Sequence, residues 1–256
     1  MPAPRKPSPA RTTGTGSGPD AGAAEDGAGE RTPAGDTRER LLDAAEALFV
    51  EHGIADTSVR AITAAAGANL ASVNYHFGGR ERLVEEVLRR RLGPMNAERL
   101  ARLDALLTRC GDAPPPLRDV MEAFLIPALE FGSSEGRGFF TLVARAQFST
   151  DENLRHLLLA QFGEVAERFG GVLARVLPGV PREELICRVF FAVGSLCHVV
   201  LNAPMLETIS GGRLGAIDDG LKQRLLDFAT AGVAAAAVPA SATASDAPAP
   251  RPDRRP

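Results

Sequence analysis

Apolar residues recur at helical spacing through almost all of residues 36–238, and no alternating run of β-branched residues is long enough to predict a strand. The first helix is predicted to begin at Asp36, an N-cap that forms a capping box with Glu39. Gly53 follows the last apolar position, and glycine is common just beyond a helix end. The apolar stripe of this helix is Leu41, Ala45, Leu48 and Phe49. The pattern therefore predicts an all-α fold.

Two short helices joined by a tight turn are predicted next. Thr57 or Ser58 caps the first of them, which ends at Gly67. The second covers about 69–76 and ends at Gly78 and the glycine after it. Small residues on both sides of the turn let the two helices cross closely. Their lengths therefore favour a helix-turn-helix.

The rest of the chain is predicted to form longer helices, separated by breaks such as GDAPPP and PGVP. Pro127 should kink the helix that contains it, and a kink opens space between packed helices. The predicted ranges are 80–92, 94–110, 117–132, 138–148, 151–176, 181–202 and 218–237.

Composition divides the chain into four parts. Residues 1–35 and 239–256 are rich in Pro, Gly and Ala and poor in large apolar groups, so both are expected to be disordered. Between them we predict a three-helix domain with the helix-turn-helix over 36–83 and a second helical domain over 84–238.

The charge of the whole chain does not indicate a nucleic-acid partner, because the formal net charge is -3 at pH 7. The distribution of charge does. Between Thr57 and Arg80 there are two arginines and no acidic residue, and the segment ANLASVNYHF at 68–77 is rich in hydrogen-bonding side chains. A surface helix normally mixes charges of both signs, so this segment favours DNA as the partner.

The second helix of a helix-turn-helix lies in the major groove, with its N-terminal half over the base edges. Asn can bond adenine, Ser can serve several bases, and Ala or Leu can touch a thymine methyl group. Asn69 could instead serve only as the N-cap of this helix. Capping the helix and contacting a base are compatible roles. The candidate base-reading residues are Asn69, Leu70, Ala71, Ser72 and Asn74.

Phosphate contacts are expected around the same helix. Tyr75 offers a hydroxyl near its end, and His76 either does the same or packs against the first helix. Arg80 begins the next helix, where a cation and free amides suit a phosphate. Arg60 is a second phosphate clamp, unless it pairs with Asp56. The candidate set is completed by the residues that open the first short helix, Thr57 and Ser58.

The segment TRERLLDAAEALFVEHGIADTSVRAITAAAGANLASVNYHFGGRERLVEEVL resembles the DNA-binding domain of the TetR family of bacterial transcriptional repressors. The shared features are Ala-Ala-x-x-Leu-Phe, Gly-x-x-x-Thr-Ser-Val-Arg, Ala-Gly at the turn, and Tyr-His-Phe followed by Gly-x-Arg-Glu. The chain departs from the pattern at Leu70, where many members have a basic residue. It departs again before His-Phe, where many members have Leu-Tyr and this chain has Val73-Asn74-Tyr75. The base preference of other members therefore cannot be carried over.

The resemblance implies a repressor that binds a near-palindromic operator and is released from it by a ligand. It also implies that Tyr75 contacts the DNA backbone. A transcriptional activator or an adaptor on the same fold is the alternative. Members of the family are two-fold dimers, and the resemblance assigns residues 181–202 and 218–237 to a four-helix bundle with the partner. A dimer also suits DNA, because two reading helices about 34 Å apart meet successive major grooves.

The C-terminal segment LRHLLLAQFGEVAERFGGVLARVLPGVPREELICRVFFAVGS is similar to a subgroup that responds to long-chain fatty acids or their CoA esters. The resemblance implies a small hydrophobic or acyl ligand. An arginine suits an acidic head group, although Glu184 lies four residues before Arg188 and favours an ordinary ion pair. Phenylalanines at helical spacing are usually core residues but can also line a pocket. The candidate ligand residues are Phe124, Phe131, Phe140, Arg145, Phe162 and Arg188.

Other function classes lack their signatures. The chain has no Gly-x-Ser-x-Gly, His-Glu-x-x-His, phosphate-binding loop or Cys-x-x-Cys, so we expect no catalytic residue, no metal and no cofactor. Its three cysteines suit a reducing cytosol. We find no apolar run of about 18 residues and no hydrophobic signal core, so we expect a cytoplasmic protein without a membrane span.

Overall fold

The computed structural model describes residues 33–133, 136–146, 150–215 and 217–236. All regular structure in these residues is helical, which confirms the all-α prediction. The predictions of disorder for 1–32 and 239–256 lie outside the described residues. The ten helices of the described part are α1 (Pro33–His52), α2 (Val59–Ala65), α3 (Ala71–Phe77), α4 (Arg80–Cys110), α5 (Leu117–Ser133), α6 (Arg137–Ala146), α7 (Glu152–Ala160), α8 (Gly163–Val176), α9 (Arg182–Ile209) and α10 (Asp219–Ala234).

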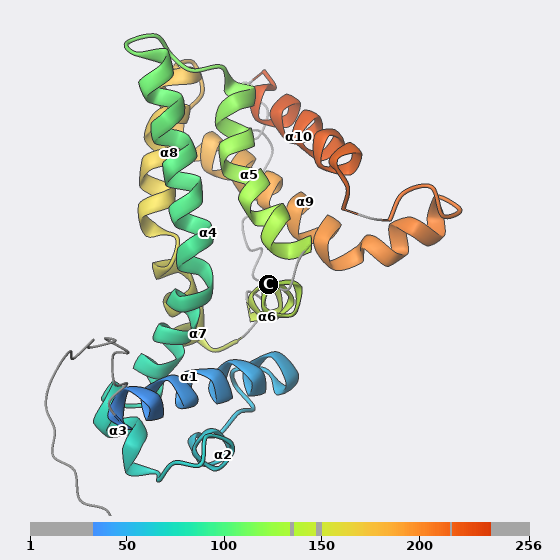
Figure 1. Cartoon of the computed structure of the whole chain (residues 1–256). Coiled ribbons are helices and arrows are strands. Elements are labelled where there is room, and N and C mark those ends of the chain that lie inside the picture. The colour runs from blue at the N-terminus through green and yellow to red at the C-terminus, as the bar shows by residue number, and fades with distance from the viewer. Residues whose placement is uncertain (1–32, 134–135, 147–149, 216, 237–256) are drawn as a thin grey trace, which may run out of the picture.

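Helices α1, α2 and α3 pack with the first turns of α4 at one end of the molecule (Figure 1), as the helix-turn-helix prediction requires. Helices α5, α7 and α8 pack along the rest of α4 toward the other end, and α6, α9 and α10 pack on these helices in turn. The predicted domain boundary after residue 83 therefore falls inside α4. The buried side chains of the first unit are Leu41, Phe49, Ile62, Val73, Phe77 and Leu83.

The first helix begins earlier than predicted. It starts at Pro33, so residues 33–35 belong to α1 and not to a disordered extension. Proline suits a first turn because the N–H it lacks has no helical partner there. Asp36 lies within the helix, where its carboxylate accepts a hydrogen bond from Arg40 at 2.5 Å. The predicted N-cap and capping box at Asp36 are therefore wrong.

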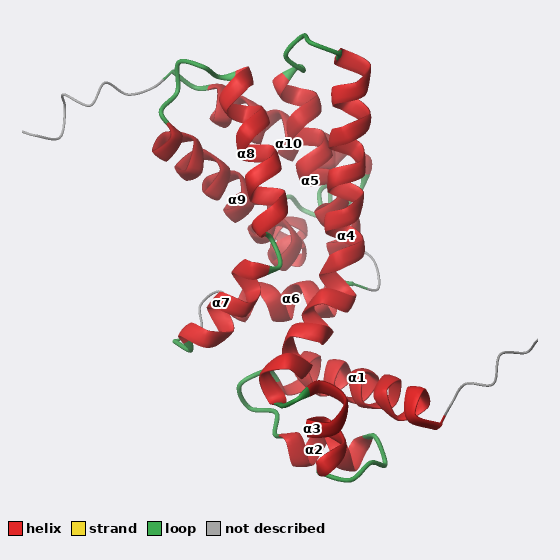
Figure 2. Cartoon of the chain, turned by 90° about the vertical axis from the view of Figure 1, so that its left-hand side faces the viewer, coloured by secondary structure: helices red, strands yellow, loops and turns green. Residues whose placement is uncertain are grey.

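Helix α4 is one long helix where the sequence predicted two, over 80–92 and 94–110. Pro94 lies inside it on an exposed position, and an internal proline removes one backbone hydrogen bond. Leu92 and Met95 on either side are buried in the core, and their packing holds the helix together across the proline. The helix thus runs without interruption from the helix-turn-helix to the far end of the molecule (Figure 2).

The predicted helix over 151–176 is two helices, α7 and α8. The amides of Gln161 and Phe162 bond to carbonyls three residues back, a tightened turn that ends α7. Gly163, a poor helix former, follows directly. Asn96 of α4 donates to the Gln161 carbonyl at 2.7 Å and holds this break in place.

Helix α9 continues past the predicted end at residue 202 and bends there. Asn202 has non-helical angles of φ -113° and ψ 20°. Pro204 explains the bend, because its ring supplies no N–H and crowds the preceding turn. The part of α9 beyond the bend projects away from the body of the molecule (Figure 1).

By length and composition alone, α9 could cross a membrane, since its 28 residues include a window of mean hydropathy 1.8. The expectation that no segment is long and apolar enough to span a membrane is therefore wrong for α9. Only 28% of that window is buried within the chain. One face of the helix packs against α5 and α8, and another carries exposed apolar side chains. Helix α9 therefore carries apolar side chains on a face that the rest of the described chain leaves exposed.

Candidate functional site

The turn between α2 and α3 is fixed by backbone and capping interactions. Ser58 caps α2, and its side-chain oxygen accepts the Ala61 amide at 3.1 Å, which confirms the predicted cap. Gly67 has φ +59°, a backbone conformation that favours glycine. The next amide, of Ala68, donates to the Thr63 carbonyl at 2.9 Å. These contacts set the position of α3 against α2.

Thr57 is an internal support of this unit. It is 3% exposed, and its hydroxyl donates to the Gly53 carbonyl at 2.7 Å. The side chain of Thr57 is therefore engaged inside the protein, and a DNA contact of Thr57 stays a prediction. The signal was ambiguous because Thr57 and Ser58 both suit a helix start, and only Ser58 takes that role.

Arg80 is also tied to the protein. Its guanidinium is partly buried and donates to the carbonyls of Ile54 and, at 3.4 Å, Thr57. These bonds join the start of α4 to the loop before α2. Arg80 therefore has a structural role as a tie, and its contact with a phosphate stays a prediction.

Helix α3 is held by two buried side chains and exposes the opposite face. Val73 is 1% exposed and Phe77 5%, and both join the core. On the other side Leu70 is 50% exposed and Tyr75 80%. Asn74 is exposed as well, and no acidic residue occurs in the helix. This face can therefore offer hydrogen bonds and apolar contact to an anionic polymer without charge repulsion.

The start of α3 is organised by Asn69. Its side-chain oxygen accepts hydrogen bonds from both the amide and the hydroxyl of Ser72, each at 2.9 Å. The capping role of Asn69 is thus confirmed, and its contact with a base stays a prediction. Ala71, between them, is exposed. Asn69 is exposed too, so the cap lies at the surface that would meet a groove.

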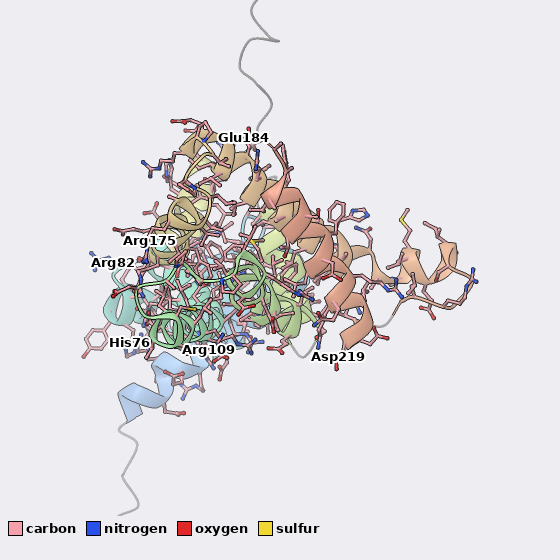
Figure 3. The ribbon with its side chains drawn as sticks, turned by 90° about the horizontal axis from the view of Figure 1, so that it is seen from above. His76, Arg82, Arg109, Arg175, Glu184 and Asp219 are labelled. Atoms are coloured by element: carbon pink, nitrogen blue, oxygen red, sulfur yellow. The ribbon has the colours of Figure 1, made fainter. Side chains whose placement is uncertain are left out.

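Two exposed arginines and a histidine flank this face. Arg60 on α2 is exposed, and the alternative ion pair with Asp56 does not occur among the described residues. His76 and Arg82 lie at the same edge of the molecule when it is seen from above (Figure 3). Arg82 was absent from the predicted set. It is exposed in the first turn of α4, close after the end of α3 at Phe77, and this place in the sequence could have identified it.

The predicted ligand arginines do not face the interior together. Arg145 is exposed on α6. Arg188 is 6% exposed; its Nε donates to Glu184 at 2.8 Å, and its Nη1 donates to the carbonyls of Val233 and Ala235 at the end of α10. The Glu184 spacing had indicated this ion pair. Arg188 is thus held by partners within the protein, and a head-group role for Arg188 or Arg145 stays a prediction.

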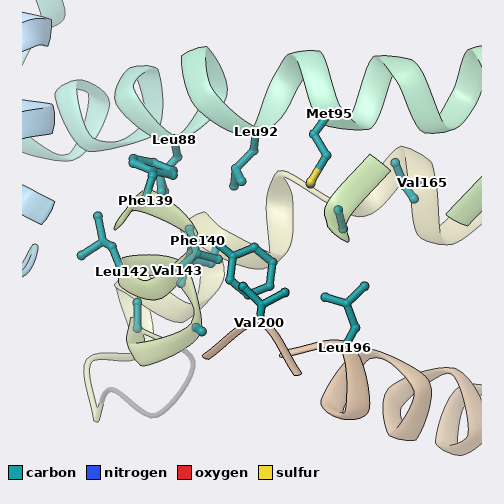
Figure 4. Close-up of a cluster of buried hydrophobic side chains, with 14 of the residues drawn as sticks. Leu88, Leu92, Met95, Phe139, Phe140, Leu142, Val143, Val165, Leu196 and Val200 are labelled. Atoms are coloured by element: carbon teal, nitrogen blue, oxygen red, sulfur yellow. The ribbon is translucent and has the colours of Figure 1, made fainter. Parts of the chain in front are cut away.

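The predicted ligand phenylalanines are parts of the helical core. Phe140 on α6 is 9% exposed, in a cluster that includes Leu92 and Val200 (Figure 4). The Phe124 ring contacts the Phe169 ring in a tilted arrangement, with ring centres 5.1 Å apart and planes at 58°. Phe131 and Phe162 are partly buried, and Phe131 borders a small surface hollow of about 250 Å³. Their contact with a ligand stays a prediction.

The most unusual polar group of the C-terminal part is Arg99, which the sequence analysis did not select. It is 5% exposed, lies 4.6 Å from the centre of the Phe124 ring, and donates through Nε to the Phe124 carbonyl at 2.8 Å. Its Nη1 donates to Asn96 at 3.2 Å. Burial lowers the pKa of Arg99 to about 10, and burial also raises the pKa of the neighbouring Cys197 thiol.

A second exposed surface lies along α9 and α10. Phe190, Phe191 and Phe228 are 70%, 67% and 67% exposed. They border an open groove of about 620 Å³ whose floor includes the buried Leu225. Isolated proteins rarely expose so many large apolar groups in one place, so this face is suited to a partner.

Comparison with known proteins agrees with this arrangement. The family described as "Bacterial regulatory proteins, tetR family" matches residues 41–87, and "Tetracyclin repressor-like, C-terminal domain" matches residues 122–232. The transcriptional repressor KstR2 of Rhodococcus jostii is 44% identical over 63 residues, 22% of this chain. That segment spans only 31% of KstR2, so the chain matches about a third of this curated relative.

Two solved structures have a similar fold over most of the chain. SmeT of Stenotrophomonas maltophilia, solved with triclosan, is 25% identical with a TM-score of 0.51, covering 85% of this chain and 99% of SmeT. FadR of Bacillus subtilis, solved with stearoyl-CoA, is 12% identical with a TM-score of 0.55, covering 76% of this chain and 98% of FadR. The two family matches, one from α1 into the start of α4 and the other from α5 to α10, show that the chain belongs to the TetR family of bacterial regulatory proteins.

Proposed function

We propose that the chain is a homodimeric, ligand-responsive transcriptional regulator that binds operator DNA through α3. The observation that carries this proposal is the outer face of α3, where Leu70, Asn74 and Tyr75 are exposed and no acid occurs. Large exposed side chains on a rigidly anchored helix suit the major groove. Arg60 and Arg82 would then meet the phosphates beside it.

Dimerisation would use the exposed phenylalanines of α9 and α10. These helices overlap most of the ranges 181–202 and 218–237 that the family pattern assigns to this role, since α9 covers Arg182–Ile209 and α10 covers Asp219–Ala234. A second copy would cover the apolar side chains that one chain leaves open. Two α3 helices related by a two-fold axis would read a near-palindromic operator, with half-sites one helical turn apart.

The regulatory ligand would be a small hydrophobic molecule held among the C-terminal helices, with a fatty acid or an acyl-CoA as the first choice. The likeness to SmeT, solved with triclosan, supports a hydrophobic ligand. Ligand would favour one of two positions of α4. This helix would carry the change to the reading unit, which is formed by α1, α2, α3 and the first turns of α4. The loss of operator affinity can be no larger than the ligand's preference between the two states.

The test is binding of the purified protein to a labelled fragment of its own upstream DNA at two salt concentrations. We expect affinity to fall steeply with salt and to exceed affinity for unrelated DNA of equal length. Tyr75→Ala should weaken specific binding, whereas Leu159→Ala, at an exposed position on α7, should leave it unchanged. Equal affinity for both DNA fragments would contradict the proposal. The operator's position relative to the promoter then separates a repressor from an activator.

A further inference from the structure

Two arginines are almost fully buried in the described part of the chain, and they differ in their partners. Arg188, 6% exposed, pairs with the Glu184 carboxylate. Arg99, 5% exposed, forms no ion pair with any carboxylate of the described residues. Its hydrogen bonds go to neutral acceptors, the Phe124 carbonyl and the Asn96 side chain. Arg99 is therefore a buried cation without a counter-ion.

A buried charge is unfavourable unless it is paired, and apolar residues of similar size usually replace such a group without loss of stability. The Phe124 ring gives partial compensation through its face, 4.6 Å from the guanidinium. The Cys197 thiol gives none, because burial raises its pKa and keeps it neutral. The arrangement therefore leaves Arg99 able to gain from an anion.

Arg99 stands at the end of an apolar stripe on α4. Leu88, Leu92, Met95 and Arg99 follow one another at intervals of three or four residues, so they share one face of the helix. Their apolar members are buried and point toward Phe140 and the side chains of α9 (Figure 4). Eleven residues of helix rise about 16 Å, so this stripe offers one charged end and a long apolar body.

We propose that Arg99 and Asn96 bind the anionic head of an amphipathic organic acid, whose apolar tail lies along the α4 stripe toward Leu88. This inference rests on the proposed function and specifies its ligand class. It favours a free acid over a CoA ester, because a thioester brings no charge to the buried end. The phosphates of coenzyme A are larger and carry more charge than one carboxylate, so bringing them to a guanidinium that is 5% exposed would cost more desolvation.

The same geometry connects ligand to DNA. The Phe124 carbonyl that now accepts from Arg99 lies on α5, one turn before Pro127. A carboxylate is a stronger acceptor than this carbonyl, so the incoming acid would replace it and release α4 from α5 at that point. Asn96 holds the α7–α8 break through Gln161, so the head group would also act on this turn. Movement of α4 reaches α3 directly, because the two helices pack together.

The first experiment uses the intact wild-type protein with decanoate and with 1-decanol, which has an equally long tail and no charge. Isothermal titration calorimetry should show decanoate binding at least about tenfold more tightly, as expected for a charge-assisted bond to a buried guanidinium. Equal affinities for decanoate and decanol, or binding of neither, would overturn the proposal.

Variants separate a binding role from a structural one. Arg99→Met should remove the preference for decanoate while its melting temperature stays equal or rises, because an apolar side chain replaces an unpaired charge. Arg99→Lys should keep part of the preference. Arg175→Met is the matched control at an exposed arginine of α8 and should behave as wild type. If Arg99→Met folds and still prefers decanoate to the full wild-type extent, the assignment is wrong.

Operator binding, measured on the same samples, keeps the two proposals apart. If specific DNA binding is present and decanoate shows no advantage over decanol, the ligand inference fails and the proposed function stands. If decanoate binds through Arg99 and no specific DNA binding is found, the acid site stands and the proposed function fails. The inference itself predicts that decanoate lowers operator affinity in the wild type and has no effect in Arg99→Met.

Discussion

The molecule has two exposed faces rich in large side chains, and their chemistry differs. The face of α3 mixes Leu70 and Tyr75 with hydrogen-bonding groups and is flanked by arginines. The face of α9 and α10 presents Phe190, Phe191 and Phe228 over an open groove. A polar, cation-flanked face suits hydrated DNA, and an apolar face suits another protein surface of the same kind. The two faces are therefore expected to bind different partners.

The largest effect is expected at the apolar face. In Phe190→Glu/Phe228→Glu, a charge would have to be buried at the dimer contact, and dimer affinity should fall by about a hundredfold or more. Sedimentation equilibrium measures the change, and operator binding should fall with it. Leu159→Glu places the same charge on an exposed position of α7 and should leave the dimer intact. A dimer that survives the double change would assign the contact to another face.

A smaller effect is expected from the face of α3. Tyr75→Ala and Leu70→Ala should each weaken specific operator binding by about tenfold, the cost of one lost contact to backbone or base. Their dimer affinity should equal that of the wild type, because both residues lie in the reading unit. Fluorescence anisotropy with labelled operator measures the first quantity and sedimentation the second. Loss of dimerisation in these variants would remove the distinction between the two faces.

Two arginines beside α3, Arg60 and Arg80, should differ in their effects on DNA binding and on stability. Arg60→Gln should reduce the slope of log affinity against log salt by about 1 and leave stability unchanged, since Arg60 is exposed. Arg80→Gln should mainly lower stability, because Arg80 ties α4 to the Ile54 and Thr57 carbonyls. Anisotropy at several salt concentrations and thermal unfolding measure these effects. A large loss of salt dependence in folded Arg80→Gln would return it to the phosphate-binding set.

The smallest effect on binding is expected at Thr57. Thr57→Val keeps the shape and loses the hydroxyl bond to Gly53, so unfolding free energy should fall by about 1 kcal/mol. The operator affinity of the folded protein should not change, because Thr57 is buried. Urea unfolding and anisotropy give the two values. Weaker binding at unchanged stability would restore Thr57 as a DNA contact.

Much of the reading unit could be predicted from the sequence because its signals are local. Ser58 at a helix start, Gly67 at the turn and Gly78 at the end of α3 each act through the backbone of their own neighbours. The errors occurred where distant packing outweighed such signals. Pro94 is a strong local break, yet burial of Leu92 and Met95 keeps α4 continuous.

The C-terminal part was harder to predict for the same reason. Arg99 has the appearance of an ordinary surface charge in the sequence, and only the packing of α5 over α4 buries it. Arg188 was chosen for its apolar surroundings, but its partners include the end of α10, 45 residues later in the chain. A charged residue can be assigned as ligand-binding or structural only when its acceptors are known.

Hydroxyl-radical footprinting of the wild-type protein on its own upstream DNA tests the central claim most directly. The account predicts two protected segments centred about 10 base pairs apart, or a multiple of one helical turn, related by approximate two-fold symmetry. It also predicts that Tyr75→Ala weakens both segments together. Protection of a single segment, or none above that on unrelated DNA, would contradict a dimer that reads DNA through α3.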